Sequence, residues 1–295
     1  MRIAVTGGSG KLGRHVVADL RAHGHEVTNI DQVGERGSGY VRVDTTDYGQ
    51  VVDALFGVQD LHEGFDAIVH LAAIPAPAIL SDVATFHNNM LTSFNVFQAA
   101  RRAGITKVVY ASSETVLGLP FDVPPPYIPV DEEYPAQPNS TYSLVKHLEE
   151  QMAIELCRWD PELQVTALRF SNVMDVDDYD EFPGFDDDAL ARKWNLWGYI
   201  DGRDGAQAVR KALEHDGTGF DRFIIANADT VMSRSSAELA AEVFPGVEVT
   251  KELGEHETLL SIDKARRILG YEPEHTWRDH APATTGDDPV AGHPS

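Results

Sequence analysis

The stretch that decides the fold is RIAVTGGSGKLG, which occupies residues 2–13 at the start of the chain. Residues 2–6 form a short apolar run that predicts a β-strand, and apolar residues at helical spacing follow from Lys11 to position 23. The junction carries glycines in a GxGxxG pattern, namely Gly7, Gly8, Gly10 and Gly13. Glycine permits a tight turn, lets backbone N–H groups approach a pyrophosphate and lets the helix pack closely on the strand. A helix N-terminus also favours phosphate, so we expect a dinucleotide beside Lys11 and Leu12.

Outward from this stretch, β-rich runs alternate with helical stretches through the first half of the chain. Further strands are expected at residues 26–30, 40–43, 67–70, 107–111 and 164–169. Further helices are expected at residues 47–56, 81–103 and 140–159. This alternation predicts an α/β fold, a Rossmann-type doubly wound parallel sheet covered by helices on both faces.

The pattern loosens after position 169. Residues 173–188 are rich in Asp, Pro and Gly and are expected to form a loop, followed by helices at 202–215, 233–243 and 262–269 and a strand at 220–226. We predict a dinucleotide-binding domain over residues 1–172 and a small substrate-binding lobe over 173–280, interleaved with the sheet. Residues 281–295 lack apolar periodicity and are expected to be a disordered tail.

The excess of acidic over basic residues bears on the kinds of binding partner that can be expected. The 295 residues include 24 basic and 47 acidic side chains, a net charge of −23, which predicts no binding to nucleic acid or to an anionic membrane. Asp is abundant and Lys scarce, which favours a salt-loving source over an ordinary acidic cytosolic protein. We expect no signal peptide and no membrane span, because no long apolar run is present. The single cysteine, Cys157, fits a reducing compartment, so a cytoplasmic protein is expected.

The second predicted strand is followed by Asp31, which bears on the choice of cofactor. A carboxylate there can bind both ribose hydroxyls of NAD and would repel the 2′-phosphate of NADP. Arg36 is close enough in sequence to reach that phosphate, so NADP stays an alternative. We predict NAD.

The chemistry is expected from YSLVK at residues 142–146, at the start of a long predicted helix. Tyr142 and Lys146 are four residues apart and so share one helical face. Free tyrosine has a pKa of about 10, and an ammonium beside it favours the phenolate. Tyr142 is therefore a candidate general acid/base. A serine of ASSETVLG, residues 111–118, follows the fifth predicted strand and can bond the same substrate oxygen.

Together these residues resemble the extended short-chain dehydrogenase/reductase family, also called the NAD-dependent epimerase/dehydratases. The resemblance runs from Met1 to about Tyr271. Its ordered motifs are TGGSGKLG, VDTTD at 43–47, HLAA at 70–73, NxxxSxNVxxAA at 89–100, SSETVLG at 112–118, YSLVK, LRFSNV at 168–173 and YIDGRD at 199–204.

The resemblance implies a catalytic triad of Ser113, Tyr142 and Lys146. It implies that cofactor contacts, besides the glycine loop and Asp31, come from Asp44, Thr45, Leu71, Ala72, Ala73, Asn89, Tyr142, Lys146, Phe170 and Val173. We place the substrate against Ile74, Ser113, Glu114, Tyr142, Ser171 and Asn172. Members of this family usually dimerise through two long helices, here residues 81–103 and 140–159, so we expect a homodimer.

Two departures from the family pattern argue against particular classes of enzyme within the family. Ser113 is followed by Glu114 and Thr115 rather than by two acids, which argues against a dehydratase. Residues 174–198 form a short, acidic segment, a poor receptor for a nucleotide diphosphate. Its acidic spacing is irregular, so no metal site is expected.

We therefore expect an NAD(P)-dependent dehydrogenase that oxidises a small sugar, such as an aldose, to its lactone. Trp194, Trp197 and Tyr199 could supply a flat wall for the sugar ring, or could pack in the core. The alternatives are a sugar or nucleotide-sugar epimerase that retains its NAD and, more remotely, a non-catalytic dinucleotide-binding regulator.

Overall fold

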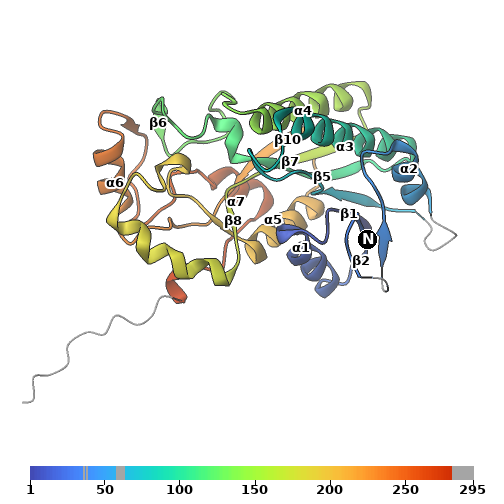
Figure 1. The fold of residues 1–295 in the computed structure, drawn as a ribbon, viewed down its shortest axis with the longest axis horizontal. Coiled ribbons are helices and arrows are strands. Elements are labelled where there is room, and N and C mark those ends of the chain that lie inside the picture. The colour runs from blue at the N-terminus through green and yellow to red at the C-terminus, as the bar shows by residue number, and fades with distance from the viewer. Residues whose placement is uncertain (36, 38, 58–63, 281–295) are drawn as a thin grey trace, which may run out of the picture.

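The computed structural model describes residues 1–35, 37, 39–57 and 64–280. Its centre is a seven-stranded parallel sheet of strand order β10-β7-β5-β4-β1-β2-β3, which confirms the predicted fold class (Figure 1). The strands are β1 Arg2–Thr6, β2 Glu26–Asp31, β3 Tyr40–Arg42, β4 Ala67–His70, β5 Lys107–Ser113, β7 Gln164–Phe170 and β10 Gly219–Ile225. The predicted role of Arg36 and the predicted disordered tail at 281–295 lie outside the described residues.

Helices cover both faces of the sheet, because each buries an apolar stripe against it. On one face lie α1 (Lys11–Ala22) and α5 (Gly202–Glu214), and on the other α2 (Tyr48–Phe56), α3 (Asp82–Arg102) and α4 (Thr141–Trp159) (Figure 1). Two separate hydrophobic clusters fill the two interfaces. The strand order reverses between β1 and β4, and parallel sheets bind ligands at the carboxyl ends of such strands.

The remaining elements are short and build a second lobe beside the carboxyl ends of the strands. They are η1 Glu114–Leu117, β6 Tyr127–Ile128, β8 Val173–Met174, η2 Val176–Asp187, η3 Lys193–Asn195, β9 Ile200–Asp201, α6 Ser236–Val243, β11 Glu248–Val249, α7 Asp263–Leu269 and η4 Trp277–Asp279. Both α5 and β10 belong to the layers of the main sheet, so the chain crosses between the two parts more than once. The domain boundaries given above stay a prediction.

The expectation of a loop at residues 173–188 is wrong in detail. This segment pairs β8 with β9 and then forms the 3₁₀ helix η2. Tyr179 and Phe182 are buried in it, and their rings pack on Tyr199. Two apolar anchors three residues apart therefore order a segment whose composition is that of a loop.

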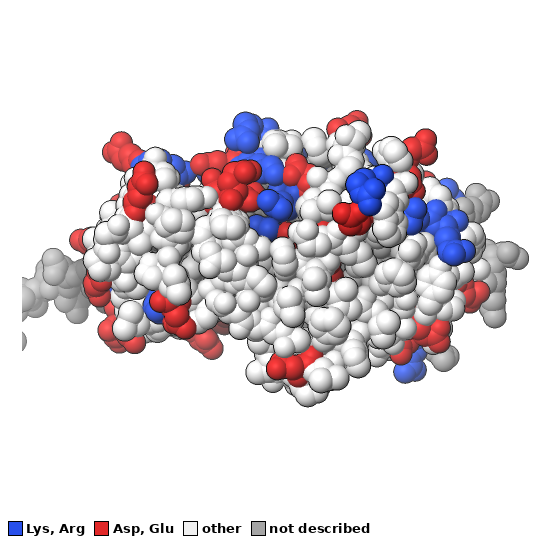
Figure 2. All heavy atoms as spheres, turned by 90° about the horizontal axis from the view of Figure 1, so that it is seen from above, with Lys and Arg blue, Asp and Glu red and all other residues white. Residues whose placement is uncertain are grey.

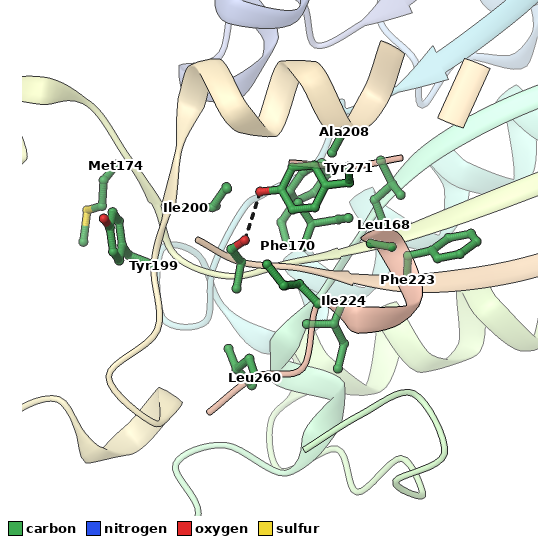
Figure 3. Packing of buried hydrophobic residues seen from close by; sticks show 14 of the residues in the cluster. Leu168, Phe170, Met174, Tyr199, Ile200, Ala208, Phe223, Ile224, Leu260 and Tyr271 are labelled. Carbon is green, nitrogen blue, oxygen red and sulfur yellow. Dashed lines mark hydrogen bonds between the residues drawn. The ribbon is translucent and has the colours of Figure 1, made fainter. Parts of the chain in front are cut away.

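The packing that joins the lobe to the sheet is shown in Figure 3. Side chains of β7 and β10, among them Leu168 and Phe223, lie close to Tyr271 from the end of the chain. The Tyr271 hydroxyl donates a hydrogen bond of 2.9 Å to the carbonyl of Ala226. The second lobe thus shares its core with one face of the sheet, which fixes the cavity between them.

Candidate active site

A cavity of about 800 Å³ opens at the carboxyl ends of β1, β2, β4, β5 and β7. Nearly all the residues predicted to form the site line it. Those are Gly7, Gly10, Lys11, Leu12, Gly13, Asp31, Thr45, Leu71, Ala72, Ala73, Ile74, Ser113, Glu114, Tyr142, Lys146, Phe170, Ser171, Asn172 and Val173. Residues far apart in sequence meet here because each follows a strand of the same sheet.

Asp44 and Asn89 are the predicted site residues that do not line the cavity. Asp44 Oδ1 accepts hydrogen bonds from the backbone and hydroxyl of Thr46, at 2.9 and 2.7 Å. Asn89 accepts from the Ile74 backbone N–H at 2.8 Å and donates to its carbonyl at 3.0 Å. Each side chain holds a loop beside the cavity, and Asn89 thereby fixes the position of Ile74.

The glycine loop fits a dinucleotide. A Cβ added at Gly13 would lie 2.1 Å from the carbonyl oxygen of Gly7, and one at Gly7 would lie 2.6 Å from the nitrogen of Ala72. The backbone therefore packs as closely as a pyrophosphate-binding turn requires. Helix α1 has no side-chain cap, so its first-turn N–H groups are left to face an anion.

Asp31 lies at the far side of this loop, at the end of β2. Its carboxylate accepts hydrogen bonds from the backbone of Ser9 at 3.0 Å and of Val33 at 3.3 Å. These bonds hold it against the cavity wall, where a carboxylate suits the ribose hydroxyls of NAD.

The three residues of the predicted triad line the same cavity. Ser113 ends β5, and its Oγ accepts from the Thr115 backbone at 3.1 Å, which caps η1. Tyr142 and Lys146 lie on the first turns of α4, a helix begun by a capping box of Ser140 and Ser143. The Lys146 ammonium lies 5.9 Å from the centre of the Tyr142 ring and donates to the carbonyl of Ala111 at 2.9 Å.

Burial raises the pKa of Tyr142, while Lys146 and Ser113 oppose the rise. Lys146 therefore lowers the pKa of Tyr142, as predicted. In the protein without a cofactor, burial of the phenol raises this pKa by more than Lys146 lowers it.

A polar group at the other end of the cavity is built around Glu114, which is almost fully buried. Asn195 of η3 donates from Nδ2 to Glu114 Oε1 at 3.2 Å. Burial raises the pKa of Glu114 to about 7, against the opposing effects of Ser171, Asn195 and Arg192. Oε2 of Glu114, Oγ of Ser171 and Oδ1 of Asn195 are buried without a well-oriented hydrogen-bond partner among the described residues.

Asn195 was not predicted, and no motif marks either Asn195 or Arg192. They reach Glu114 because the turn 192–198 folds back on itself, with Asn195 Nδ2 donating to the carbonyl of Gly198 at 2.8 Å. Glu114 and Ser171, which line the cavity, could hydrogen-bond the hydroxyl groups of a sugar.

Of the three aromatic residues expected to form a flat wall, Trp194 alone lines the cavity. Trp197 and Tyr199 are fully buried, with their polar atoms bonded to Ala189 and Asp229. For these two the alternative of core packing is correct. The Arg192 guanidinium lies 5.0 Å from the Trp194 ring and holds it at the cavity edge.

No acidic side chain of segment 174–198, which the structure describes in full, lines the cavity, and two of these acids pair with helix α1. Asp178 pairs with Lys11, and Asp175 pairs with Arg14 and, at 2.7 Å, with His15. These carboxylates join η2 to helix α1, so the inference that they would repel a nucleotide diphosphate does not hold. Within the part of the chain that the structure describes, no metal-binding group of side chains is present, and no helix could cross a membrane.

Comparison with known proteins bears on the family and the activity. A model of the NAD dependent epimerase/dehydratase family matches residues 3–226. A UDP-glucose 4-epimerase of Corynebacterium glutamicum is 28% identical over 94% of this chain and 92% of its own length. One of Bacillus subtilis is 28% identical over 58% of this chain and 52% of its own. A crystal structure of a UDP-galactose 4-epimerase is 27% identical, with a TM-score of 0.66 and 94% of each chain covered.

These findings correct the expected activity. The similar proteins are epimerases, so the prediction of a free-sugar dehydrogenase is wrong and the alternative of an epimerase is better supported. The NAD-dependent character of the matched family agrees with the predicted cofactor.

Proposed function

Because the chain belongs to the NAD dependent epimerase/dehydratase family, we propose that it is an NAD-dependent sugar epimerase that keeps its cofactor through turnover. One observation carries the proposal: Ser113, Tyr142 and Lys146 line the same cavity as the glycine loop. Sugar nucleotides, the substrates named for the similar epimerases, are the first candidates.

Tyr142 acts as the acid and base in this proposal. Its phenolic oxygen takes the proton of a sugar hydroxyl as the carbon is oxidised, and returns that proton when the carbon is reduced from the other face. Ser113 holds the same sugar oxygen by a hydrogen bond. NAD, when bound, supplies a reversible two-electron oxidant.

Lys146 has the geometry to serve the cofactor side. An ammonium has three donors, and two of them go to Ala111 and Glu149. The third is left for the cavity, where it can bind the cofactor's ribose and favour the phenolate of Tyr142.

The polar group around Glu114 would orient the sugar. Glu114 and Ser171 line the cavity with polar side chains, and Trp194 lines the same cavity with an apolar surface. Epimerisation requires the sugar to present both faces in turn. A site that holds the ring by a few hydroxyl contacts at one end permits that rotation.

Homodimerisation and a cytoplasmic location stay predictions. Exposed apolar side chains on α3 and α4, among them Val83, Leu91, Phe94 and Leu144, support a homodimer through these helices. From above, Figure 2 shows a broad region without charged side chains, bordered by clusters of acidic and basic ones. Uncharged surface of this kind is suited to association.

The test is Tyr142→Phe, assayed with UDP-glucose and UDP-galactose at low and high KCl. We expect the wild-type protein to interconvert the two sugars without accumulating reduced nicotinamide. We expect the variant to keep its NAD and lose about 100-fold or more in kcat, because the proton acceptor is gone. Product is measured by chromatography and bound NAD by extraction.

Tyr134→Phe is the matched control, since Tyr134 is buried outside the cavity and its hydroxyl bonds Gln137 at 3.1 Å. It should keep wild-type turnover. Stoichiometric release of reduced nicotinamide with an oxidised sugar would contradict the proposal. So would an unchanged rate in Tyr142→Phe.

A further inference from the structure

Behind the triad lies a buried acid that the proposed mechanism does not use. Glu149 Oε2 lies 3.0 Å from Nζ of Lys146, and the two side chains are 0% and 4% exposed. Glu149 does not line the cavity and therefore touches neither sugar nor cofactor. Glu149 can therefore affect the reaction only through its contact with Lys146.

The other oxygen of Glu149 belongs to a hydrogen-bonded chain whose direction can be worked out. Ser93 of α3 donates its single hydroxyl proton to Glu149 Oε1 at 2.8 Å. His70 Nε2, 3.1 Å from the same hydroxyl, must then donate to it. His70 Nδ1 is consequently an acceptor and takes the proton of the Thr6 hydroxyl at 2.7 Å.

Along this series of hydrogen bonds, each donated proton is directed toward Glu149. The members of the series are at most 3% exposed: Thr6, His70, Ser93, Lys146 and Glu149. Thr6 precedes the glycine loop, and its hydroxyl also lies 3.4 Å from the backbone nitrogen of Ala72. These hydrogen bonds therefore connect the Glu149 carboxylate to the ends of β1 and β4, beside the predicted cofactor site.

Resting on the proposed function, we infer that Glu149 is a positioning residue that sets the acid–base strength of Tyr142 through Lys146. A carboxylate in contact with the ammonium cancels part of its charge and so weakens its attraction for the phenolate. The same contact, with that of Ala111, fixes two of the three donors of Lys146. The third donor is thereby directed at the cavity.

The other charged groups around the pair do not substitute for Glu149. Glu150, the next residue of α4, is held by two hydrogen bonds from Arg169, at 2.9 and 2.7 Å, and one from Ser112. His70 faces Lys146 from β4 but is neutral, because burial lowers its pKa to about 3. Glu114 faces Tyr142 from η1 and lies on the substrate side.

The pKa directions agree with this geometry. Besides burial, Glu149 and Glu114 raise the pKa of Tyr142, whereas Lys146 lowers it. Burial raises the pKa of Glu149, and contact with Lys146 and Ser93 opposes the rise. Removing the charge of Glu149 should therefore lower the pKa of Tyr142.

The test is Glu149→Gln, which keeps the shape and removes the charge. The ultraviolet absorbance of tyrosinate, taken as the difference between each protein and its Tyr142→Phe counterpart, follows Tyr142 without any substrate. We expect its pKa to fall by about 1 unit or more, the usual effect of a close charge. The acidic limb of the pH profile of kcat/KM should move to lower pH in the same sense.

Ser93→Ala is the matched control, because it removes the bond to Oε1 and leaves the carboxylate on Lys146. Its Tyr142 titration should shift by much less than that of Glu149→Gln. Equal shifts in the two variants would make the role purely structural and overturn the inference, as would an unshifted titration in Glu149→Gln.

Should Glu149→Gln not fold, Glu149→Asp retracts the carboxylate by one methylene and should lower the Tyr142 pKa by a smaller amount. An unshifted titration there also overturns the inference. The absorbance titration separates the two proposals. A shift in a protein that epimerises none of the sugars tested would refute the proposed function and leave the role of Glu149 standing.

Discussion

The two ends of the cavity are built in different ways. The cofactor end is backbone: a glycine loop, the N-terminus of α1 and one carboxylate, Asp31, all within a short stretch of chain. The substrate end is side chain: Glu114 and Asn195 meet across 81 positions of sequence. The difference teaches that a contiguous motif can specify a cofactor, whereas a substrate is recognised by residues that only folding brings together.

The largest effect is expected at the cofactor end, from Gly13→Val. The added Cβ would lie 2.1 Å from the carbonyl oxygen of Gly7, so the loop must move. Because the backbone that would hold the pyrophosphate is displaced, we expect NAD affinity to fall by about 100-fold, the size of loss that a misplacement of about 1 Å causes in catalytic rate. Binding is measured by calorimetry, with circular dichroism to verify the fold.

Gly10→Ala is the control for this variant, because its Cβ would lie 3.3 Å from the same oxygen and needs only a small adjustment. NAD affinity should fall far less. If the two variants bound NAD equally well, close backbone packing would not be what defines the cofactor end.

A second effect is expected at the substrate end and depends on pH. The pKa of Glu114 is raised from 4.5 to about 7 in the folded protein, so the native state holds a proton that the unfolded state has lost. The free energy of unfolding should fall by about 3 kcal/mol between these two pH values on account of this group. Glu114→Gln should lack that fall, as measured by urea denaturation at pH 4.5, 6 and 8.

The comparison is between wild type and variant at each pH, so other titrating groups cancel. A constant difference in stability across the series would mean that Glu114 is not held protonated by burial. It would also remove the basis for treating the substrate end as a desolvated polar group.

The smallest effect is expected from Trp194→Ala. Trp194 is half-buried and lines the cavity, so loss of its ring should raise KM for the sugar by about 3-fold through the loss of a small apolar contact area. NAD affinity should not change. Trp159→Ala, at the exposed end of α4, is the control and should leave both constants unchanged.

Much of the fold was predictable because it rests on periodicity. Alternation of apolar runs with helical spacing led to the seven-stranded parallel sheet, and the glycine loop and YSLVK led to residues that line the cavity. Each signal lies within a few consecutive residues, where backbone geometry follows directly from residue type.

The activity was predicted wrongly for the opposite reason. Segment 174–198 looked like an exposed acidic loop, but Tyr179 and Phe182 anchor it in the core, and Asp175 and Asp178 turn toward α1. Composition describes how many charges a segment carries. It does not say which partners neutralise them.

The sequence by itself thus determined the sheet and the glycine loop, and it led to the predicted triad of Ser113, Tyr142 and Lys146. Only the tertiary structure decided that Trp197 is core while Trp194 lines the cavity, that Asn195 reaches Glu114, and that Glu149 touches Lys146. The physical reason is the range of the interactions. Strands, helices and tight turns are set by neighbours in the chain, whereas burial and pairing of charges depend on which distant segments pack together.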